Sequence, residues 1–131
     1  MQKGWEGLIP ETLTLTVSLR GTRDVRDNCQ IFRLTGLLDA FSEGIFRKLL
    51  TKYVKDGPPH IILDLSTIDF VDSSGLGAMV QVVKEANKAG GSVQMVSNSR
   101  VTQTGKLVRL EKFFSLQPSV DAAIANLNKG D

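Results

Sequence analysis

The chain has 131 residues, a length typical of one domain that encloses a single hydrophobic core. Hydrophobic residues make up 41% and charged residues 23%, the usual mix for globular proteins, which disfavours a fibrous or largely disordered chain. The 16 basic and 14 acidic residues are interspersed and leave a net charge of +2, so nucleic acid is not expected as a direct partner.

Single residues and short runs limit the possible chemistry. Cys29 is the only cysteine, so neither an intramolecular disulfide nor a thiolate metal cluster can form. His60 is the only histidine, and sites are built from groups that converge, so we expect no chemical role for it. We expect no metal and no cofactor. Apolar runs such as residues 61–63 are far shorter than the roughly 20 residues of a membrane span, and the N-terminus lacks a signal peptide's apolar stretch. We therefore expect a cytoplasmic protein with no membrane partner.

The first elements in chain order are strands. Residues 1–11 show little periodicity and are predicted to be a flexible N-terminal segment, which leaves 12–131 as the domain. Between Leu13 and Leu19 apolar residues alternate with threonines and a serine, the pattern of a half-buried strand. A polar segment, residues 21–28, indicates a turn, and the apolar run 29–35 predicts a second strand that completes a hairpin.

A helix is predicted after Gly36. Asp39 is its expected N-cap, and Gly57 with Pro58 ends it. Its apolar stripe has spacings near 3.6 and comprises Phe41, Ile45, Leu49, Leu50, Tyr53 and Val54.

The second half of the chain alternates between strands and helices. Residues 61–65 form a short apolar run bounded by turn residues, which indicates a central strand covered on both faces. A helix is predicted from at or near Ser73 to Gly90 and Gly91, followed by a strand over 93–96 and a weaker helical pattern over 100–111.

The last helix is expected to cover one face of the sheet. Pro118 suits its first turn, and its apolar stripe comprises Val120, Ala123, Ile124 and Leu127. The order of elements predicts an α/β fold, a single domain with a mixed β-sheet of about four strands and about four α-helices joined by right-handed crossovers.

Residues 69–78 are the segment that carries chemistry, because they lie between the buried strand and an amphipathic helix, where functional loops of open sheets cluster. Ser73 at a helix start has two explanations: its oxygen caps the helix, or the free N–H groups there hold a phosphate. Gly75 and Gly77 either allow close approach of another chain or allow tight helix-to-sheet packing.

Several site types are disfavoured. Ser73 lacks the Gly-x-Ser-x-Gly elbow of hydrolases, and the only histidine precedes Ser73 in the chain, contrary to the order in that class. An enzyme with Ser73 as nucleophile is kept as an alternative to a binding function. The full phosphate-binding loop of nucleotide hydrolases is absent. Asp69 and Asp72 are more simply caps and turn formers than metal ligands.

The run Asp72-Ser73-Ser74-Gly75-Leu76-Gly77 resembles the signature of STAS domains, especially the bacterial anti-sigma-factor antagonists. Residues 62–66, 35–39 and 113–114 add to the resemblance, which spans roughly 12–128. It implies phosphorylation of Ser73, with Ser74 the weaker candidate. The partner-binding residues that it implies are Asp39, Asp72, Ser73, Ser74, Gly75, Leu76 and Gly77.

The resemblance also implies partners. The unphosphorylated protein would bind an anti-sigma factor that is also a serine kinase and thereby free a sigma factor, and a PP2C-like phosphatase would reset it. The sequence departs from the family pattern at Leu37, where relatives often have a polar or acidic residue, and in the longer charged segment Arg20–Asn28. The alternatives are a STAS module that binds a small ligand or nucleotide through the same loop, or a component of another partner-switching complex.

Overall fold

The computed structural model describes residues 10–107 and 114–129, so most of the predicted flexible segment and the end of the pattern over 100–111 lie outside it. Within this range six strands form one sheet: β1 (Glu11–Thr16), β2 (Leu19–Val25), β3 (Cys29–Leu38), β4 (His60–Val71), β5 (Ser92–Val96) and β6 (Ser115–Gln117). The helices are α1 (Glu43–Asp56), α2 (Ser73–Lys88), α3 (Ser99–Leu107) and α4 (Val120–Lys129).

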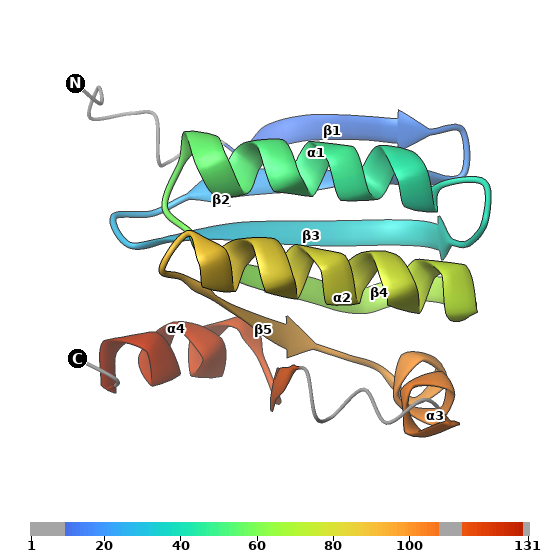
Figure 1. Ribbon diagram of the computed structural model, residues 1–131. Coiled ribbons are helices and arrows are strands. Elements are labelled where there is room, and N and C mark those ends of the chain that lie inside the picture. The colour runs from blue at the N-terminus through green and yellow to red at the C-terminus, as the bar shows by residue number, and fades with distance from the viewer. Residues whose placement is uncertain (1–9, 108–113, 130–131) are drawn as a thin grey trace.

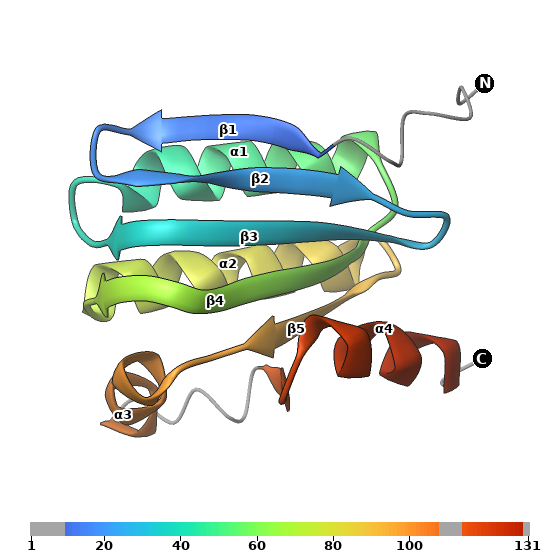
Figure 2. The same ribbon diagram turned by 180° about the vertical axis from the view of Figure 1, so that it is seen from behind.

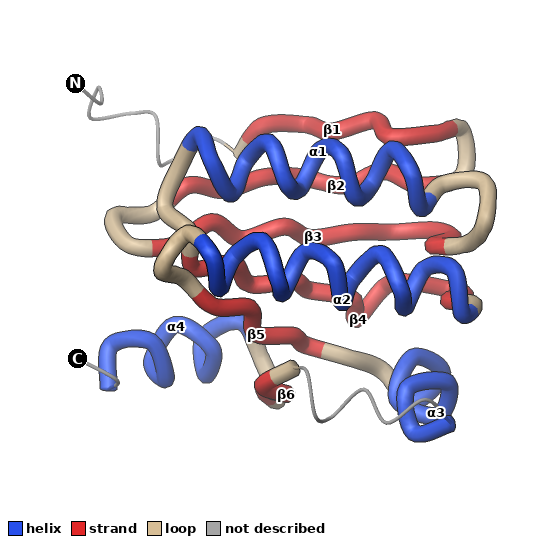
Figure 3. The backbone as a smooth tube through the Cα atoms, in the orientation of Figure 1, coloured by secondary structure: helices blue, strands red, loops and turns tan. Residues whose placement is uncertain are grey.

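The sheet is mixed, as predicted, and its strands lie side by side in chain order. Strands β1 to β3 are antiparallel neighbours, and β3 to β6 are parallel. Helices α1 and α2 lie together over one face of the sheet (Figure 1), whereas Figure 2 shows much of the opposite face of β1 to β4 without a helix in front of it. Helix α3 lies at the end of the sheet where β3 and β4 finish (Figure 3).

Two clusters of buried apolar side chains hold these layers together. The larger lies between the sheet and helices α1 and α2, and includes Phe32 and Leu63 from the strands and Phe46 and Met79 from the helices. The smaller lies under α4 and contains Cys29, Ile31, Ile62 and Ala123, with Val120, Ile124 and Leu127 packed against it. The prediction that the last helix covers one sheet face is therefore confirmed.

Strand β4 is the central strand that the apolar run predicted. It pairs with β3 on one side and β5 on the other, and its neighbouring residues Ile62 and Leu63 enter the two different clusters. The strand continues to Val71, well beyond the predicted end at residue 65. This extension carries the Asp72 loop to the edge of the sheet.

The sheet has six described strands instead of the predicted four or so, and two of them differ from the sequence pattern. A turn at Val17 and Ser18 divides the strand predicted over residues 13–19, and the segment predicted to be a turn is mostly β2. Strand β2 carries polar residues on both faces, and Arg20, Thr22 and Asp24 lie on one of them. On the other, Arg23 stacks 3.9 Å from the centroid of the Tyr53 ring, with its Nε donating to Gln30 Oε1 at 2.8 Å. The other additional strand, β6, has only three residues.

Two helix starts also differ from the prediction. Helix α1 begins at Glu43, so Ser42 and not Asp39 is its N-cap. Its buried stripe is Phe46, Leu50 and Val54, whereas Phe41 and Ile45 are exposed. Helix α4 begins at Val120, after the Ser119 hydroxyl that accepts the Ala122 N–H at 3.0 Å, so Pro118 precedes the helix.

Candidate functional site at the start of helix α2

The site lies where the parallel strands β3 and β4 end side by side. Leu38 and Val71, their last residues, are register partners, and the Asp72 N–H donates to the Leu38 carbonyl at 3.2 Å. The loops that leave the two strands are therefore adjacent. One leads to α1 through Asp39, and the other leads to α2 through Asp72.

The Asp72 carboxylate joins these two loops. It is the N-cap of α2, in extended backbone conformation, and its Oδ1 accepts the Gly75 N–H at 2.9 Å. Its Oδ2 accepts the Ala40 N–H from the other loop at 3.2 Å. The capping role considered for Ser73 therefore belongs to Asp72, because Ser73 is already the first residue of the helix.

Asp39 organises the first loop instead of capping α1. Its Oδ1 accepts the N–H groups of Phe41 at 3.0 Å and Ser42 at 3.2 Å, which forms a tight turn ahead of the helix. The buried Ser42 hydroxyl donates to the Leu37 carbonyl at 2.9 Å. The loop is thus held by its own polar groups, and it leaves the Phe41 side chain outside.

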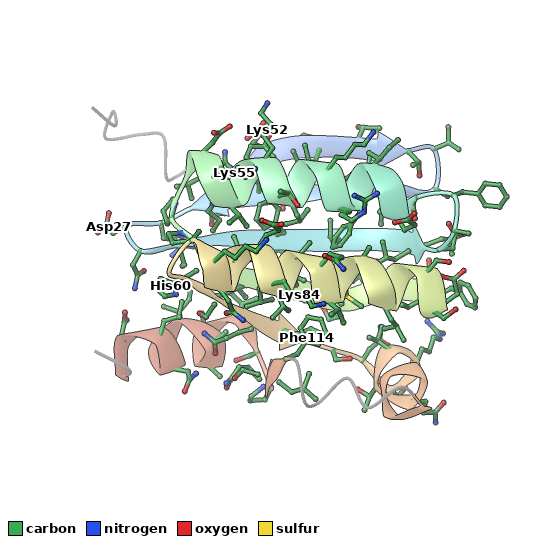
Figure 4. The ribbon with its side chains drawn as sticks, viewed as in Figure 1. Asp27, Lys52, Lys55, His60, Lys84 and Phe114 are labelled. Carbon is green, nitrogen blue, oxygen red and sulfur yellow. The ribbon has the colours of Figure 1, made fainter. Side chains whose placement is uncertain are left out.

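Ser73 and Ser74 occupy the first two positions of α2, and both are exposed. Within the described part of the chain, neither hydroxyl makes a hydrogen bond. His60 cannot serve as a base for Ser73, because it lies at the other end of β4 (Figure 4), where its Nδ1 is 2.9 Å from the Ser92 hydroxyl. The site therefore presents two hydroxyls that are not hydrogen-bonded to a general base among the described residues.

Gly75 and Leu76 face inward. A Cβ on Gly75 would lie 2.3 Å from the Leu38 carbonyl oxygen, so this glycine permits the close contact between α2 and the end of β3. Leu76 is buried in the main core. Of the two roles considered for Gly75, the structure supports tight packing of the helix against the sheet. Gly75 and Leu76 can therefore influence a partner only through the shape of the loop.

Gly77 differs from Gly75, because it is exposed and a Cβ there would meet no atom within 4 Å. Together with both serines it borders a shallow depression between α1 and α2. The residues that line the depression are Glu43, Arg47, Ser73, Ser74, Gly77, Ala78 and Gln81. Arg47 Nε lies 3.6 Å from Glu43 Oε2, one helical turn away.

Several exposed apolar side chains lie at this same end of the molecule. The large hydrophobic side chains exposed among the described residues are Val17 (105%), Phe41 (91%), Ile45 (48%), Phe70 (51%) and Leu116 (45%). The first four lie at the end of the sheet that carries Ser73: Val17 in the β1–β2 turn, whose Ser18 carbonyl accepts the Leu37 N–H at 2.8 Å, and the others in or beside the two loops. We call these four residues the apolar rim.

The apolar rim could not be recognised from the sequence pattern. Phe41, Ile45 and Leu49 are four residues apart, a spacing that fits the buried stripe of a helix, so the pattern predicts that Phe41 and Ile45 are buried. The competing stripe at Phe46, Leu50 and Val54 has the same spacing, and it is the signal that could have found the buried face. Phe70 lies within residues 69–78, but nothing in that segment marks it as exposed.

Comparisons with known proteins agree with this architecture. A model of the STAS domain matches residues 22–123. An anti-sigma F factor antagonist from Paenibacillus polymyxa is 27% identical over 100 residues, which cover 76% of this chain and 84% of that protein. The crystal structure of an anti-sigma factor antagonist from Mycobacterium paratuberculosis superposes with a TM-score of 0.76 at 23% identity, covering 85% of this chain and 95% of that one.

A second solved structure is that of the anti-sigma factor antagonist SpoIIAA in its unphosphorylated form. It superposes with a TM-score of 0.66 at 18% identity and covers 85% of this chain and 99% of its own. None of the described helices combines the length and apolar character needed to cross a membrane. Proteins similar to this chain are anti-sigma-factor antagonists. The family model covers most of the chain, and the loop after β4 carries the expected motif, so the protein belongs to the STAS domain family.

Proposed function

We propose that the protein is an anti-sigma-factor antagonist that binds, in its unphosphorylated form, an anti-sigma factor with serine kinase activity. Phosphorylation of Ser73 ends the binding, and a PP2C-like phosphatase restores it in the cytoplasm. The observation that supports this proposal best is the position of Ser73, exposed and without a hydrogen-bond partner in the described residues, directly after the capping Asp72. A kinase can reach this hydroxyl without opening the fold.

The assignment of Ser73 over Ser74 comes from the family motif. Both hydroxyls are exposed, so accessibility does not distinguish them. The motif places the modified serine directly after the aspartate, and Asp72 is held by hydrogen bonds to both loops. The similar antagonist SpoIIAA was solved in what is described as its unphosphorylated form. That description implies that SpoIIAA also has a phosphorylated form, which supports a phosphorylation cycle for this chain.

The surroundings of Ser73 are suited to binding another protein. The apolar rim supplies hydrophobic area that is otherwise left in water, and buried aromatic anchors commonly dominate binding energy. Asp39 lies in the loop before α1, and among the described residues its carboxylate accepts hydrogen bonds only from Phe41 and Ser42, so it favours a partner surface with a basic residue at its edge. A phosphoryl group on Ser73 would place about −1.5 to −2 charges within this contact area.

The first prediction concerns the modified residue. Incubation with ATP and the partner kinase, recovered by affinity capture on the Ser73→Ala form, is expected to place phosphate on Ser73. Peptide mass spectrometry locates it. The matched control, Ser74→Ala, keeps the same exposed loop and should be phosphorylated like the natural chain. Phosphate found mainly on Ser74, or remaining in Ser73→Ala, would overturn the assignment.

A second prediction concerns Phe41. Changing Phe41→Ser should weaken binding to the captured anti-sigma factor by about 10- to 100-fold, the loss expected for one aromatic anchor. Thermal stability should stay nearly constant, because the ring is 91% exposed and contributes little to the core. The measurement is isothermal titration of the two purified proteins.

Leu116 provides the matched control for Phe41, since it is also exposed but lies on β6, away from Ser73. Leu116→Ser should change the affinity less than about twofold, as expected for an exposed residue outside the interface. If Phe41→Ser and Leu116→Ser bind equally well, the apolar rim has no part in the interface.

A further inference from the structure

The depression between α1 and α2 places one cation beside the two serines. On α2 its wall is the stripe of Ser74, Gly77, Ala78 and Gln81, which recur at helical spacing, with Ser73 at its mouth. On α1 the wall is Glu43 and Arg47, one turn apart. Arg47 is the only basic residue among those that line the depression.

The present partner of Arg47 holds it weakly. The distance from Arg47 Nε to Glu43 Oε2 is 3.6 Å, beyond the 2.7–3.2 Å of a good hydrogen bond, and both side chains are partly exposed, at 43% and 33%. Exposed pairs of this spacing contribute little to stability. The guanidinium group therefore has donors available for a stronger acceptor.

The space in front of Arg47 is also open. Gly77 contributes no side chain, and no other atom lies within 4 Å of where its Cβ would be. Ala78 adds only a buried methyl group. A group attached to Ser73 can therefore enter the depression without displacing a large side chain.

We propose that Arg47 binds the phosphoryl group of phosphorylated Ser73, exchanging its contact with Glu43 for a bidentate contact with phosphate oxygens. A guanidinium group matches two oxygens of a phosphate monoester dianion and binds them more strongly than it binds a distant carboxylate. The depression thus binds a phosphoryl group carried by the same chain, and Arg47 offsets the repulsion of that group by the carboxylates of Glu43 and Asp72. The use of this site in the cell rests on the proposed phosphorylation of Ser73.

The binding itself can be tested without any kinase. Phosphoserine is introduced at position 73 during biosynthesis, and the second ionisation of its phosphate is followed by ³¹P NMR against pH. A guanidinium contact favours the dianion, so Arg47→Gln should lower the second acid dissociation constant of the phosphoserine by about twofold or more. Glu43→Gln should strengthen that acidity, because it removes both the competitor and a repelling charge.

Lys48→Gln is the matched control, because Lys48 is an exposed cation on the same helix that does not line the depression. It should leave the ³¹P titration nearly unchanged. Thermal melts of the unphosphorylated variants establish that each is folded. Equal titration curves for Arg47→Gln and Lys48→Gln would refute the contact. Failure of any kinase to modify Ser73 would instead refute the proposed function. The ³¹P result would still decide whether Arg47 contacts the phosphate, because it does not depend on a kinase.

Discussion

Gly75→Ala should destabilise the protein by about 1–3 kcal/mol, although alanine is normally the better helix former. The added Cβ would lie 2.3 Å from the Leu38 carbonyl oxygen and 2.9 Å from Leu38 Cγ. Backbone at the end of a central strand cannot move away as a flexible side chain could. The strain also reaches the cap, since the Gly75 N–H is the group that Asp72 Oδ1 accepts.

Gly75→Val should lose still more stability, because a branched side chain adds bulk at the same contact and restricts its own rotamers in the helix. Gly77→Ala is the matched control on the same helix. Its Cβ meets nothing within 4 Å, so the change should stabilise the protein by up to about 1 kcal/mol through helix propensity alone.

Urea unfolding followed by circular dichroism compares the three variants with the natural chain. The order of midpoints should be Gly77→Ala highest, then the natural chain, then Gly75→Ala, then Gly75→Val. A Gly75→Ala midpoint equal to or above that of the natural chain would mean that Leu38 yields easily, and that Gly75 is not needed for the contact between α2 and β3.

The location of the site could be predicted from the sequence, but its internal geometry could not. Residues 69–78 lie between an apolar strand and an amphipathic helix, and that placement alone puts Ser73 at the edge of the sheet. Serine and aspartate are both good N-caps, so the choice between Ser73 and Asp72 depends on a single residue in the helix start. Only the structure shows that Asp72 also holds the other loop through the Ala40 N–H.

The fold was predictable where burial imposed a period and was missed where it did not. Strand β4 and helix α2 have continuous or helical apolar patterns because they are covered by other elements. In β2, Arg20, Thr22 and Asp24 lie on one face and Arg23 packs against Tyr53 on the other, so polar residues fall on both faces. Phe41 shows the opposite failure, since it fits the helical spacing but precedes the helix and is exposed.

Phosphorylation of Ser73 should strongly weaken partner binding while leaving the fold nearly unchanged. The phosphate is added at the exposed start of α2, where helix N–H groups and the dipole offset repulsion from Asp72, so the free energy of unfolding should change by only about 1 kcal/mol either way. Partner binding is different. A partner seated on the apolar rim would have to bury a phosphate dianion whose charge Arg47 offsets only in part, and taking such a charge out of water costs several kcal/mol.

One titration decides whether phosphorylation of Ser73 switches partner binding. The Ser73-phosphorylated and unmodified proteins, shown by thermal melting to be equally folded, are titrated with the captured anti-sigma factor. We expect the phosphorylated form to bind at least about 100-fold more weakly, which corresponds to a loss of about 2.7 kcal/mol. Equal affinities of the two forms would contradict the switch.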